Sequence, residues 1–440
     1  MELSVDRPLD LRVSGGDLLV PSVGLRNSSS TDFQGISEEV LKLSPANRRK
    51  KELLFQQIAS DLPLFDFTAR LSDAEEDVRH ILLHFFPTSD PATTKVRLTF
   101  LLAKSSVDVF LLCYQLTQLV GGITNVLYLA KGIPKVNKVL IRVSGEHTEN
   151  LIDRDQELVT LMSLASIGVG PSIYGRFKNG LLYGFVEGNA VESEQLKDPV
   201  VSRLTAEHLG FFHAKCDVAG VPREPILFDT ISKWLNTAQI DQPADVSESL
   251  SEIGFSFAKS KEIVLELEAQ MDSASLLVCF CHNDLLSGNV IFEPEAAGGP
   301  AVHFIDFEYG GYNYRGFDIG NHFCEMMGFE LDDSKYPTEH FQREWIASYL
   351  RSFLHHSDLQ EPEDWDIQVE RLRKQVQLFS ILAHLFWGIW AVIQHQYATV
   401  KEFDYLSYAR LRLSTFIRLF NSKGHRIVLT ALDTPPPKTI

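Results

Sequence analysis

The sequence VCFCHNDLLSGNVIF, residues 278–292, sets a short polar segment between two apolar runs. Short runs of β-branched and aromatic residues favour buried strands, whereas Asn, Ser and Gly between them favour a tight turn. A second run, VHFIDFE at 302–308, has the same apolar character and ends in acidic residues. We therefore expect strand, polar loop and strand, with Asp284, Asn289 and Asp306 at strand ends around one loop.

The spacing H-x-D-x4-N, followed by I-D-F-E, suits phosphoryl transfer from a magnesium-bound nucleotide. Asp284 can accept the proton of an attacking hydroxyl group, and Asn289 and Asp306 offer the hard oxygen ligands that Mg²⁺ prefers. Taken singly, either acid is explained as well by a turn cap or by the end of an edge strand. The ordered set favours the catalytic loop and the metal loop of a kinase.

A candidate phosphate-binding loop is GGITN at 121–125, which leads into an expected strand. Gly121 and Gly122 let the backbone approach a phosphate closely, and Thr124 and Asn125 add hydrogen-bond donors. A plain hairpin turn explains this loop equally well. The phosphate interpretation depends on the strand and the helix that follow.

The next expected strand carries Arg142, and the helix after it carries Glu157. A strand cation paired with a helix glutamate behind a glycine loop positions nucleotide phosphates in kinases, and a guanidinium group binds phosphate with two hydrogen bonds. An ordinary surface ion pair is the alternative. After a hairpin expected over 173–186, the chain leaves the sheet at Phe185 and Glu187, where a two-lobed kinase has the hinge whose backbone reads adenine.

The rest of the chain is expected to be mainly helical. Helices are expected at 72–86, 155–167, 200–215, 228–235, 255–271, 319–327, 339–353, 363–394 and 403–419, with a strand at 95–100. The segment 309–318 is interpreted as a Gly/Tyr loop in which Asp318 caps the following helix. Glu325 shares a helix face with Asp318, where it either binds a cation or stays a surface acid. Trp387 and Trp390 either belong to the core or wall a pocket for an ammonium group.

Composition and charge exclude several classes of protein. A net charge of −17 argues against non-specific nucleic-acid binding. The 5 cysteines are few and lie in apolar contexts, which indicates reduced thiols in a cytoplasmic protein, and Cys279-x-Cys281 is too short for a zinc knuckle. The N-terminus lacks the features of a signal peptide. The apolar segments 98–120 and 378–393 fall short of the ~18–20 clean apolar residues of a membrane span, so we expect a soluble protein without membrane insertion.

The motifs resemble those of the choline/ethanolamine kinases over about residues 121–419. The most specific matches are GGITN at 121–125, VLIR at 139–142, CHNDLLSGN at 281–289, IDFEYGGYNYRGFDIGN at 305–321 and WGIWAVIQHQ at 387–396. The resemblance implies an α+β, bilobal protein-kinase-like fold, with a small N-lobe built on an antiparallel sheet at 61–188 and a larger, mainly helical C-lobe at 189–430. Residues 1–60 would be a flexible arm and 431–440 a disordered tail.

The resemblance also implies roles for single residues. Asp284 would be the catalytic base, and Asn289 and Asp306 would bind Mg²⁺. The ATP-binding residues would be Gly121, Gly122, Thr124, Asn125, Arg142, Glu157, Phe185 and Glu187. The amino-alcohol pocket would contain Glu325, Trp387, Trp390 and Tyr408.

The sequence leaves two amino alcohols, ethanolamine and choline, as candidate substrates. Residues 394–399, 403–406 and 325–337 look more like ethanolamine kinases, whereas 315–317 and 323–325 look more like choline kinases. We expect an ATP- and Mg²⁺-dependent kinase that makes phosphoethanolamine, the first step of phosphatidylethanolamine synthesis by the CDP-ethanolamine route. A choline kinase, or an enzyme acting on both alcohols, is the alternative. A homodimer and a catalytically inactive, kinase-like binding protein are both left open.

The chain departs from the family pattern at 101–120, where mostly apolar residues stand in place of a short passage. We interpret this segment as an insertion or as a wrongly assigned exon. Aminoglycoside phosphotransferases share the H-x-D-x4-N spacing but lack counterparts of Glu325, Trp387 and Trp390.

Overall fold

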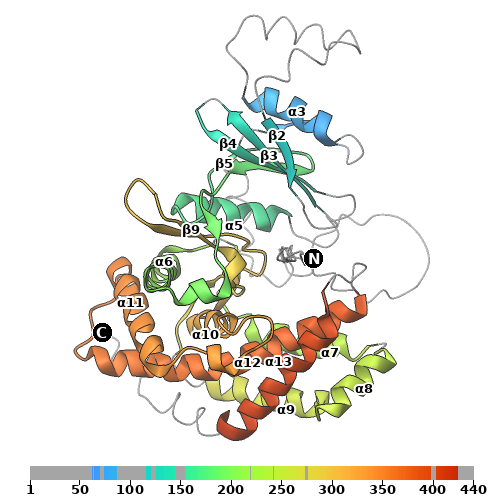
Figure 1. Ribbon diagram of the computed structural model, residues 1–440, viewed down its shortest axis with the longest axis vertical. Helices are drawn as coiled ribbons and strands as arrows, with labels where there is room; N and C mark the ends of the chain where they lie inside the picture. The colour runs from blue at the N-terminus through green and yellow to red at the C-terminus, as the bar shows by residue number, and fades with distance from the viewer. Residues whose placement is uncertain are drawn as a thin grey trace, which may run out of the picture. The chain divides into compact units, whose positions relative to one another are not determined.

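Figure 1 shows the computed structural model of the chain. It describes residues 62, 64–69, 74–86, 115–119, 125–133, 135–144, 154–218, 220–240, 242–272, 276–397 and 403–424. The chain divides into two compact units. The first takes its described residues from Ala59–Ile152 and Pro171–Phe185, and the second from Asp153–Gly170 and Val186–Ile440. Residues 153–170, which the sequence-based division counts in the N-lobe, group with the second unit.

The first unit is a sheet with one described helix, α3 (Ala74–Phe85). The strands are β1 (Leu64–Phe65), β2 (Gln115–Leu119), β3 (Asn125–Ile133), β4 (Asn137–Ser144), β5 (Ile173–Phe177) and β6 (Gly180–Gly184). Their order is β1-β5-β6-β4-β3-β2. Neighbouring strands are antiparallel except for β1 and β5, which are parallel.

The core of the first unit follows from the alternation of residues in β4. Val139, Ile141 and Val143 are fully buried, because every second side chain of a strand faces the same side of the sheet. They pack in one cluster with apolar residues of α3, among them Ile81. Burial of each aliphatic side chain contributes about 1.5–3 kcal/mol. The same alternation turns Arg142 toward the opposite face, where it is half-buried.

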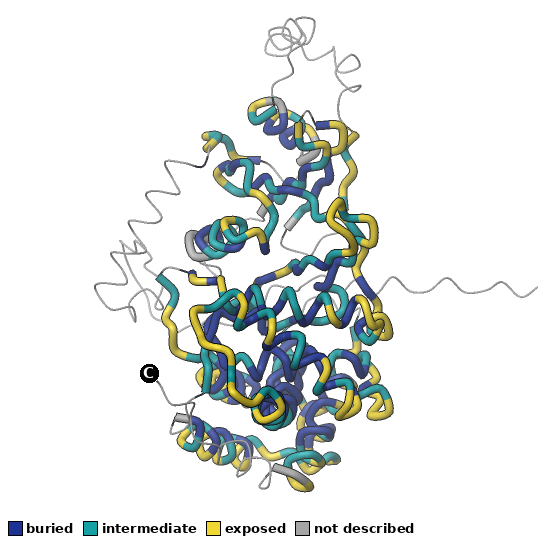
Figure 2. Tube along the Cα trace, turned by 90° about the vertical axis from the view of Figure 1, so that its left-hand side faces the viewer, coloured by how far each residue is buried: buried dark blue, intermediate teal, exposed yellow. Residues whose placement is uncertain are grey.

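The second unit is mainly helical. Its helices are α5 (Arg154–Ser166), α6 (Pro199–Lys215), α7 (Leu227–Ala238), α8 (Ala244–Glu252), α9 (Phe257–Asp272), α10 (Arg315–Glu325), α11 (Glu339–His356), α12 (Trp365–Tyr397) and α13 (Tyr405–Leu419). Buried residues lie in the interior of this unit and exposed residues on its outside (Figure 2). Helix α12 forms the core, since most of its residues from Val376 onward are buried.

Two glycines let these helices approach closely. A Cβ atom on Gly210 of α6 would lie 2.5 Å from the backbone oxygen of Tyr349 in α11. A Cβ atom on Gly320 of α10 would lie 2.8 Å from the backbone nitrogen of Ser380 in α12. Any larger residue would push the helices apart, so these glycines set the spacing of α6, α10, α11 and α12.

Two small sheets in the second unit confirm the predicted strand, loop and strand. Strand β8 (Val278–Cys281) pairs with β11 (Gly311–Tyr314). Strand β9 (Val290–Glu293) pairs with β10 (Ala301–Phe304) and with β7 (Asn189–Ala190). The segment between β8 and β9 therefore starts and ends at fixed strands, as the apolar runs around it predict.

Several sequence-based expectations need correction. Residues 311–314 form strand β11 rather than a loop, because their backbone pairs with β8 across register partners such as Tyr312 and Phe280. Residues 115–119, expected within an insertion, form β2 and pair with β3. Helix α8 was not expected, and α12 begins two residues later and ends three residues later than predicted. The expected strand at 95–100 lies outside the described residues.

Helix α12 also changes the membrane argument. It contains an 18-residue window with a mean hydropathy of 1.8, so by length and composition it is apolar enough to cross a membrane. The expectation that this segment is too short is therefore wrong. Of that window, 89% is buried inside the protein, as is typical of the core helix of a globular unit.

Candidate active site

The loop after β8 has a strained backbone at Asn283, whose φ of 65° lies in the left-handed region. A non-glycine residue stays in this region only when its surroundings hold it there. The Asn283 side chain donates to the backbone oxygen of Tyr309 at 2.9 Å and accepts a hydrogen bond from Asn313 at 2.8 Å. Strand β11 thus fixes the turn that places Asp284.

Asp318 holds the same loop from the other side. Its fully buried carboxylate accepts hydrogen bonds from the backbone N–H groups of His282 and Asn283, both at 2.8 Å. His213 donates to it from α6 at 3.0 Å. Burial would raise the pKa of Asp318, but the hydrogen bond and the charge of His213 lower this pKa below its ordinary value. Asp318 is therefore ionised and holds the loop in place through these hydrogen bonds. The prediction that it caps α10 is wrong, because α10 begins at Arg315.

His282 links this loop to the segment that carries Asp306. Its Nε2 atom lies 2.9 Å from the backbone oxygen of Ile305, and the backbone N–H of Asp284 donates to its Nδ1 atom at 3.3 Å. One nitrogen must donate and the other accept, which describes a neutral imidazole. Burial lowers the pKa of His282 and keeps it in that form. The histidine therefore sets the spacing between Asp284 and Asp306.

Asp284, Asn289 and Asp306 come together as predicted from sequence. The Asn289 side-chain amide donates to the backbone oxygen of Asp284 at 2.9 Å and to its carboxylate at 3.4 Å. Asp306 is exposed and has a φ of 64°. Burial and the negative charges of Glu325 and Asp306 raise the pKa of Asp284 well above its usual range. Carboxylate and amide oxygens are hard ligands, and a site that combines them suits a divalent cation such as Mg²⁺.

Glu325 is held by an arginine that the sequence analysis did not single out. Arg412 of α13 donates to the Glu325 carboxylate at 2.5 Å and to the Tyr408 hydroxyl at 2.8 Å. The Arg412 side chain is 1% exposed and the Glu325 side chain 12%. A buried guanidinium group needs such partners, because an unpaired buried charge is costly. Glu325 is therefore a fixed carboxylate, and the prediction of a plain surface acid does not apply.

The aromatic residues are tied to the catalytic loop by hydrogen bonds. The indole N–H of Trp387 donates to Asn321 at 2.8 Å, and that of Trp390 donates to the Tyr309 hydroxyl at 3.1 Å. The two indole rings lie 5.5 Å apart, nearly perpendicular. Asn321 in turn donates to the backbone oxygen of Asn283 at 3.4 Å. These contacts join α12, α10 and the loop after β8 in one rigid arrangement.

Comparison with known proteins identifies the family. The family model described as Choline/ethanolamine kinase matches residues 116–417. The chain belongs to the choline/ethanolamine kinase family. Since the match begins at 116, the predicted insertion does not extend to 120, and β2 is part of the family fold. Kinases of this family use ATP, so the prediction of ATP as a cofactor is supported at this level.

Individual relatives agree with this assignment. The chain is 35% identical over 308 residues to ethanolamine kinase 1 of Mus musculus, covering 68% of this chain and 82% of that protein. It is 34% identical over 287 residues to the ethanolamine kinase of Drosophila melanogaster, but there it covers only 54% of the relative and 64% of this chain. The solved structure of a Plasmodium vivax ethanolamine kinase has a TM-score of 0.58 and 27% identity, covering 71% of this chain and 84% of that one. The predicted fold class is confirmed.

The nucleotide-binding residues predicted for this family member are placed only in part. Gly121, Gly122 and Thr124 lie outside the described residues, and Asn125 begins β3. Arg142 lies in β4 between register partners in β3 and β6. Glu157 lies in α5, which belongs to the other unit, so its pairing with Arg142 stays a prediction. Phe185 follows β6 with the Lys138 ammonium 4.8 Å above its ring, and Glu187 is exposed two residues later.

The structure adds three residues to the site. Tyr309 and Arg412 were not singled out in the sequence analysis, and Asp318 was interpreted there as a helix cap. A signal existed for Arg412, since it lies four residues after Tyr408 on an otherwise apolar helix face. A signal also existed for Asp318, because it stands between Phe317 and Ile319, and an acid that is buried needs a partner. Neither signal identifies the partner residue, because His213 lies in α6 and Glu325 lies in α10, far from Asp318 and Arg412 in sequence.

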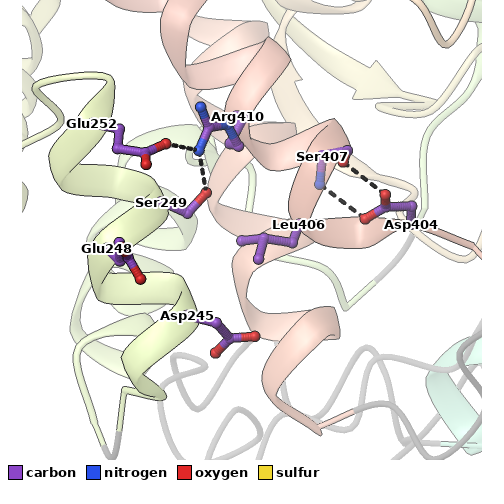
Figure 3. Close-up of a pocket in the computed structure, with 8 residues that line it drawn as sticks. All are labelled: Asp245, Glu248, Ser249, Glu252, Asp404, Leu406, Ser407 and Arg410. Carbon is purple, nitrogen blue, oxygen red and sulfur yellow. Dashed lines mark hydrogen bonds and ion pairs between the residues drawn. The ribbon is translucent and has the colours of Figure 1, made fainter.

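We expect Arg412→Met to lower the free energy of unfolding by at least about 3 kcal/mol, because it leaves the buried Glu325 carboxylate unpaired. Urea titration of the purified protein measures this. A matched control is Arg410→Met on the same helix. Arg410 pairs with Glu252 of α8 at the surface, in the hollow that Figure 3 shows.

The exposed pair should contribute no more than about 1 kcal/mol, so Arg410→Met should be nearly as stable as wild type. A double variant, Arg412→Met with Glu325→Gln, should recover part of the loss, because no charge is then left buried and unpaired. Equal losses for Arg410→Met and Arg412→Met would contradict the assigned role of Arg412.

Proposed function

We propose that the chain transfers the γ-phosphoryl group of ATP to the hydroxyl group of ethanolamine, with Mg²⁺, and so forms phosphoethanolamine for the CDP-ethanolamine route. The main support is the loop in which Asn289 holds Asp284, a potential proton acceptor. Glu325, a carboxylate fixed by Arg412, acts on Asp284 through its charge and can pair with the substrate ammonium group. The relatives whose names include ethanolamine kinase support the same substrate.

Each residue of the loop would have a distinct task in this reaction. Asp284 would orient the substrate hydroxyl and accept its proton as the new O–P bond forms. Asn289 and Asp306 would hold Mg²⁺, which when bound offsets the charge of the transferred phosphoryl group. The amide of Asn289 also keeps Asp284 in place through its two hydrogen bonds. Asp318 and His282 would maintain the spacing between the base and the metal ligands.

Substrate choice depends on how the ammonium group is recognised. The –NH₃⁺ group of ethanolamine offers three hydrogen bonds, which suit Glu325 and the hydroxyl groups of Tyr309 and Tyr408. The trimethylammonium group of choline offers none and favours aromatic faces. The perpendicular rings of Trp387 and Trp390 favour choline in this respect, so choline kinase activity is the second candidate function.

We expect kcat/KM for ethanolamine to exceed that for choline by at least about tenfold, because a site with buried acceptors rejects a substrate that cannot donate to them. A coupled assay with both alcohols under identical conditions measures this. A choline value equal to or above the ethanolamine value would replace ethanolamine by choline as the substrate. If neither alcohol is phosphorylated while ATP with Mg²⁺ still raises the melting temperature, the inactive binding protein becomes the better description.

We also propose a cytoplasmic enzyme without membrane insertion, because ATP is abundant in the cytoplasm and the apolar part of α12 is mostly buried. Four cysteines of the described residues, Cys216, Cys279, Cys281 and Cys324, are buried free thiols, which suits a reducing compartment. A homodimer stays a prediction that sedimentation of the full chain can test.

A further inference from the structure

Three side chains with metal-binding atoms converge behind the catalytic loop. They are His213 of α6 and Cys279 and Cys281 of β8. Their ligating atoms all lie within 4.8 Å of one another, and all three residues are buried. The sequence analysis set Cys279-x-Cys281 aside because the spacing is too short for a zinc knuckle, and it could not foresee a third ligand from the distant helix α6.

The two thiols share one side of β8, because residues two apart in a strand face the same way. Their sulfur atoms lie 3.7 Å apart. A disulfide between them is unfavourable, since two residues apart on a strand places the Cα atoms roughly 6.6 Å from each other, at the upper limit of disulfide geometry. The strand therefore presents a pair of thiols as two separate ligands.

The spacing of the thiols matches that of two ligands on one tetrahedral zinc ion. With Zn–S bonds of about 2.3 Å, tetrahedral geometry sets the two sulfur atoms about 3.8 Å apart. The observed separation of 3.7 Å requires almost no movement of β8. Two thiolates with an imidazole nitrogen form a donor set that selects zinc-type ions over Mg²⁺.

The surroundings of His213 also resemble those of a metal ligand. One ring nitrogen, Nε2, faces the Asp318 carboxylate at 3.0 Å, and the other, Nδ1, lies 2.9 Å from the Tyr349 hydroxyl. Metal-binding histidines commonly donate one N–H to a carboxylate and use the other nitrogen for the ion. The ion would thus replace the Tyr349 hydroxyl at Nδ1, while Asp318 keeps its hydrogen bond.

We propose that His213, Cys279 and Cys281 form a binding site for one zinc-type divalent ion in the core of the second unit. Binding displaces the thiol protons of Cys279 and Cys281 and the Nδ1 proton of the charged His213 ring. One divalent cation, two thiolates and a neutral imidazole then leave the buried cluster without net charge. The bound ion fixes His213, which donates to the Asp318 carboxylate. Asp318 in turn accepts from the backbone N–H groups of His282 and Asn283, so the ion stabilises the catalytic loop.

The test uses the full-length protein, first freed of metal with a chelator, and cadmium as the probe. Cd²⁺ bound to thiolates gives an ultraviolet charge-transfer band, and titration to equilibrium should show one ion per chain in the presence of excess Mg²⁺. Zn²⁺ should displace the cadmium and remove the band. The variants are Cys279→Ser and Cys281→Ser, and the matched control is Cys216→Ser, which removes a buried thiol outside the cluster.

Each cluster variant should bind Cd²⁺ more than about 100-fold more weakly, because replacing residues that merely support a metal ligand already costs about 10- to 100-fold. Cys216→Ser should bind like wild type. An absent band in wild type, or an unchanged affinity in Cys279→Ser, would overturn the site. X-ray absorption of the zinc-loaded wild type needs no variant and should count two sulfur ligands; a count of none would also overturn it. These readouts require neither ATP nor an amino alcohol, so they stand apart from the proposed kinase activity.

Discussion

Replacement of Asp284 by asparagine is expected to lower kcat with ethanolamine by about 10²- to 10⁴-fold, the range supplied by a positioned general base. Asparagine keeps the shape of the side chain, and its amide oxygen can still accept a hydrogen bond from Asn289. In the wild type the Asn289 amide nitrogen lies 3.4 Å from the Asp284 carboxylate. It cannot take the proton of the attacking hydroxyl. Initial rates at saturating ATP and Mg²⁺ measure the effect, and ATP-dependent thermal shift should be retained. A variant with near-normal kcat would remove Asp284 from the chemistry.

The same substitution should leave the fold as stable or make it more stable at neutral pH. Burial and the charges of Glu325 and Asp306 raise the folded-state pKa of Asp284 above its unfolded value of about 3.9. Between these two pKa values the folded state binds more protons than the unfolded state, so ionised Asp284 costs stability as pH rises through this window. Asparagine removes that cost. The melting-temperature gain of Asp284→Asn over wild type should shrink as pH falls toward about 4.

Wild-type activity should show the matching pH dependence. Asp284 accepts a proton only when ionised, so kcat/KM should fall as pH drops through its raised pKa. A residue kept for chemistry at a cost in stability is the usual pattern in active sites. Asp284→Asn should have no such acidic limb in whatever activity remains.

Much of the active site could be predicted because its residues lie close together in sequence. The apolar runs around His282 and Asp284 predict strands, and the strands bring Asn289 and Asp306 to the same place. Apart from α8, the helices of the second unit were predicted for a similar reason, since apolar residues at helical spacing are a local signal. Boundaries shifted by a few residues at most elements.

The residues that sequence reasoning missed depend on contacts between distant segments. Asp318 was interpreted as a helix cap, a local role, but its partners are backbone N–H groups 35 and 36 residues earlier. Arg412 pairs with Glu325 across 87 residues. Strand β11 was missed because the Gly and Asn residues of 311–314 favour turns, and only the pairing with β8 outweighs that tendency.

Asp318 connects the features that were predicted with those that were not. It fixes the left-handed turn at Asn283, takes a hydrogen bond from His213 and lies on the helix that carries Asn321 and Glu325. Helix α10 therefore supports the proposed base from one end and presents the proposed ammonium partner at the other. A shift of this helix would change both at once, and this explains why Gly320 must stay small to keep α10 against α12.

Replacement of Asp306 by asparagine is expected to lower Mg²⁺-dependent turnover by about 10³-fold, equivalent to about 4 kcal/mol of lost charge stabilisation. Asparagine is the sharper substitution, because Asp306 has a φ of 64° and Asn tolerates the left-handed region far better than Ala does. The shape and backbone are then preserved while the negative charge is removed. Initial rates across a range of Mg²⁺ concentrations measure both the rate and the metal requirement.

A matched control is Asp358→Asn, an exposed carboxylate in the connection between α11 and α12. It removes the same charge from the protein without touching the loop, and it should leave the rate and the Mg²⁺ requirement unchanged. Asn289→Ala should weaken turnover less than Asp306→Asn, since an amide contributes no charge to metal binding. Higher Mg²⁺ should partly restore Asp306→Asn if the lost charge acts through the metal. A variant with the wild-type rate and Mg²⁺ requirement would exclude Asp306 as a metal ligand, because a charged ligand cannot be lost without weakening the bound ion.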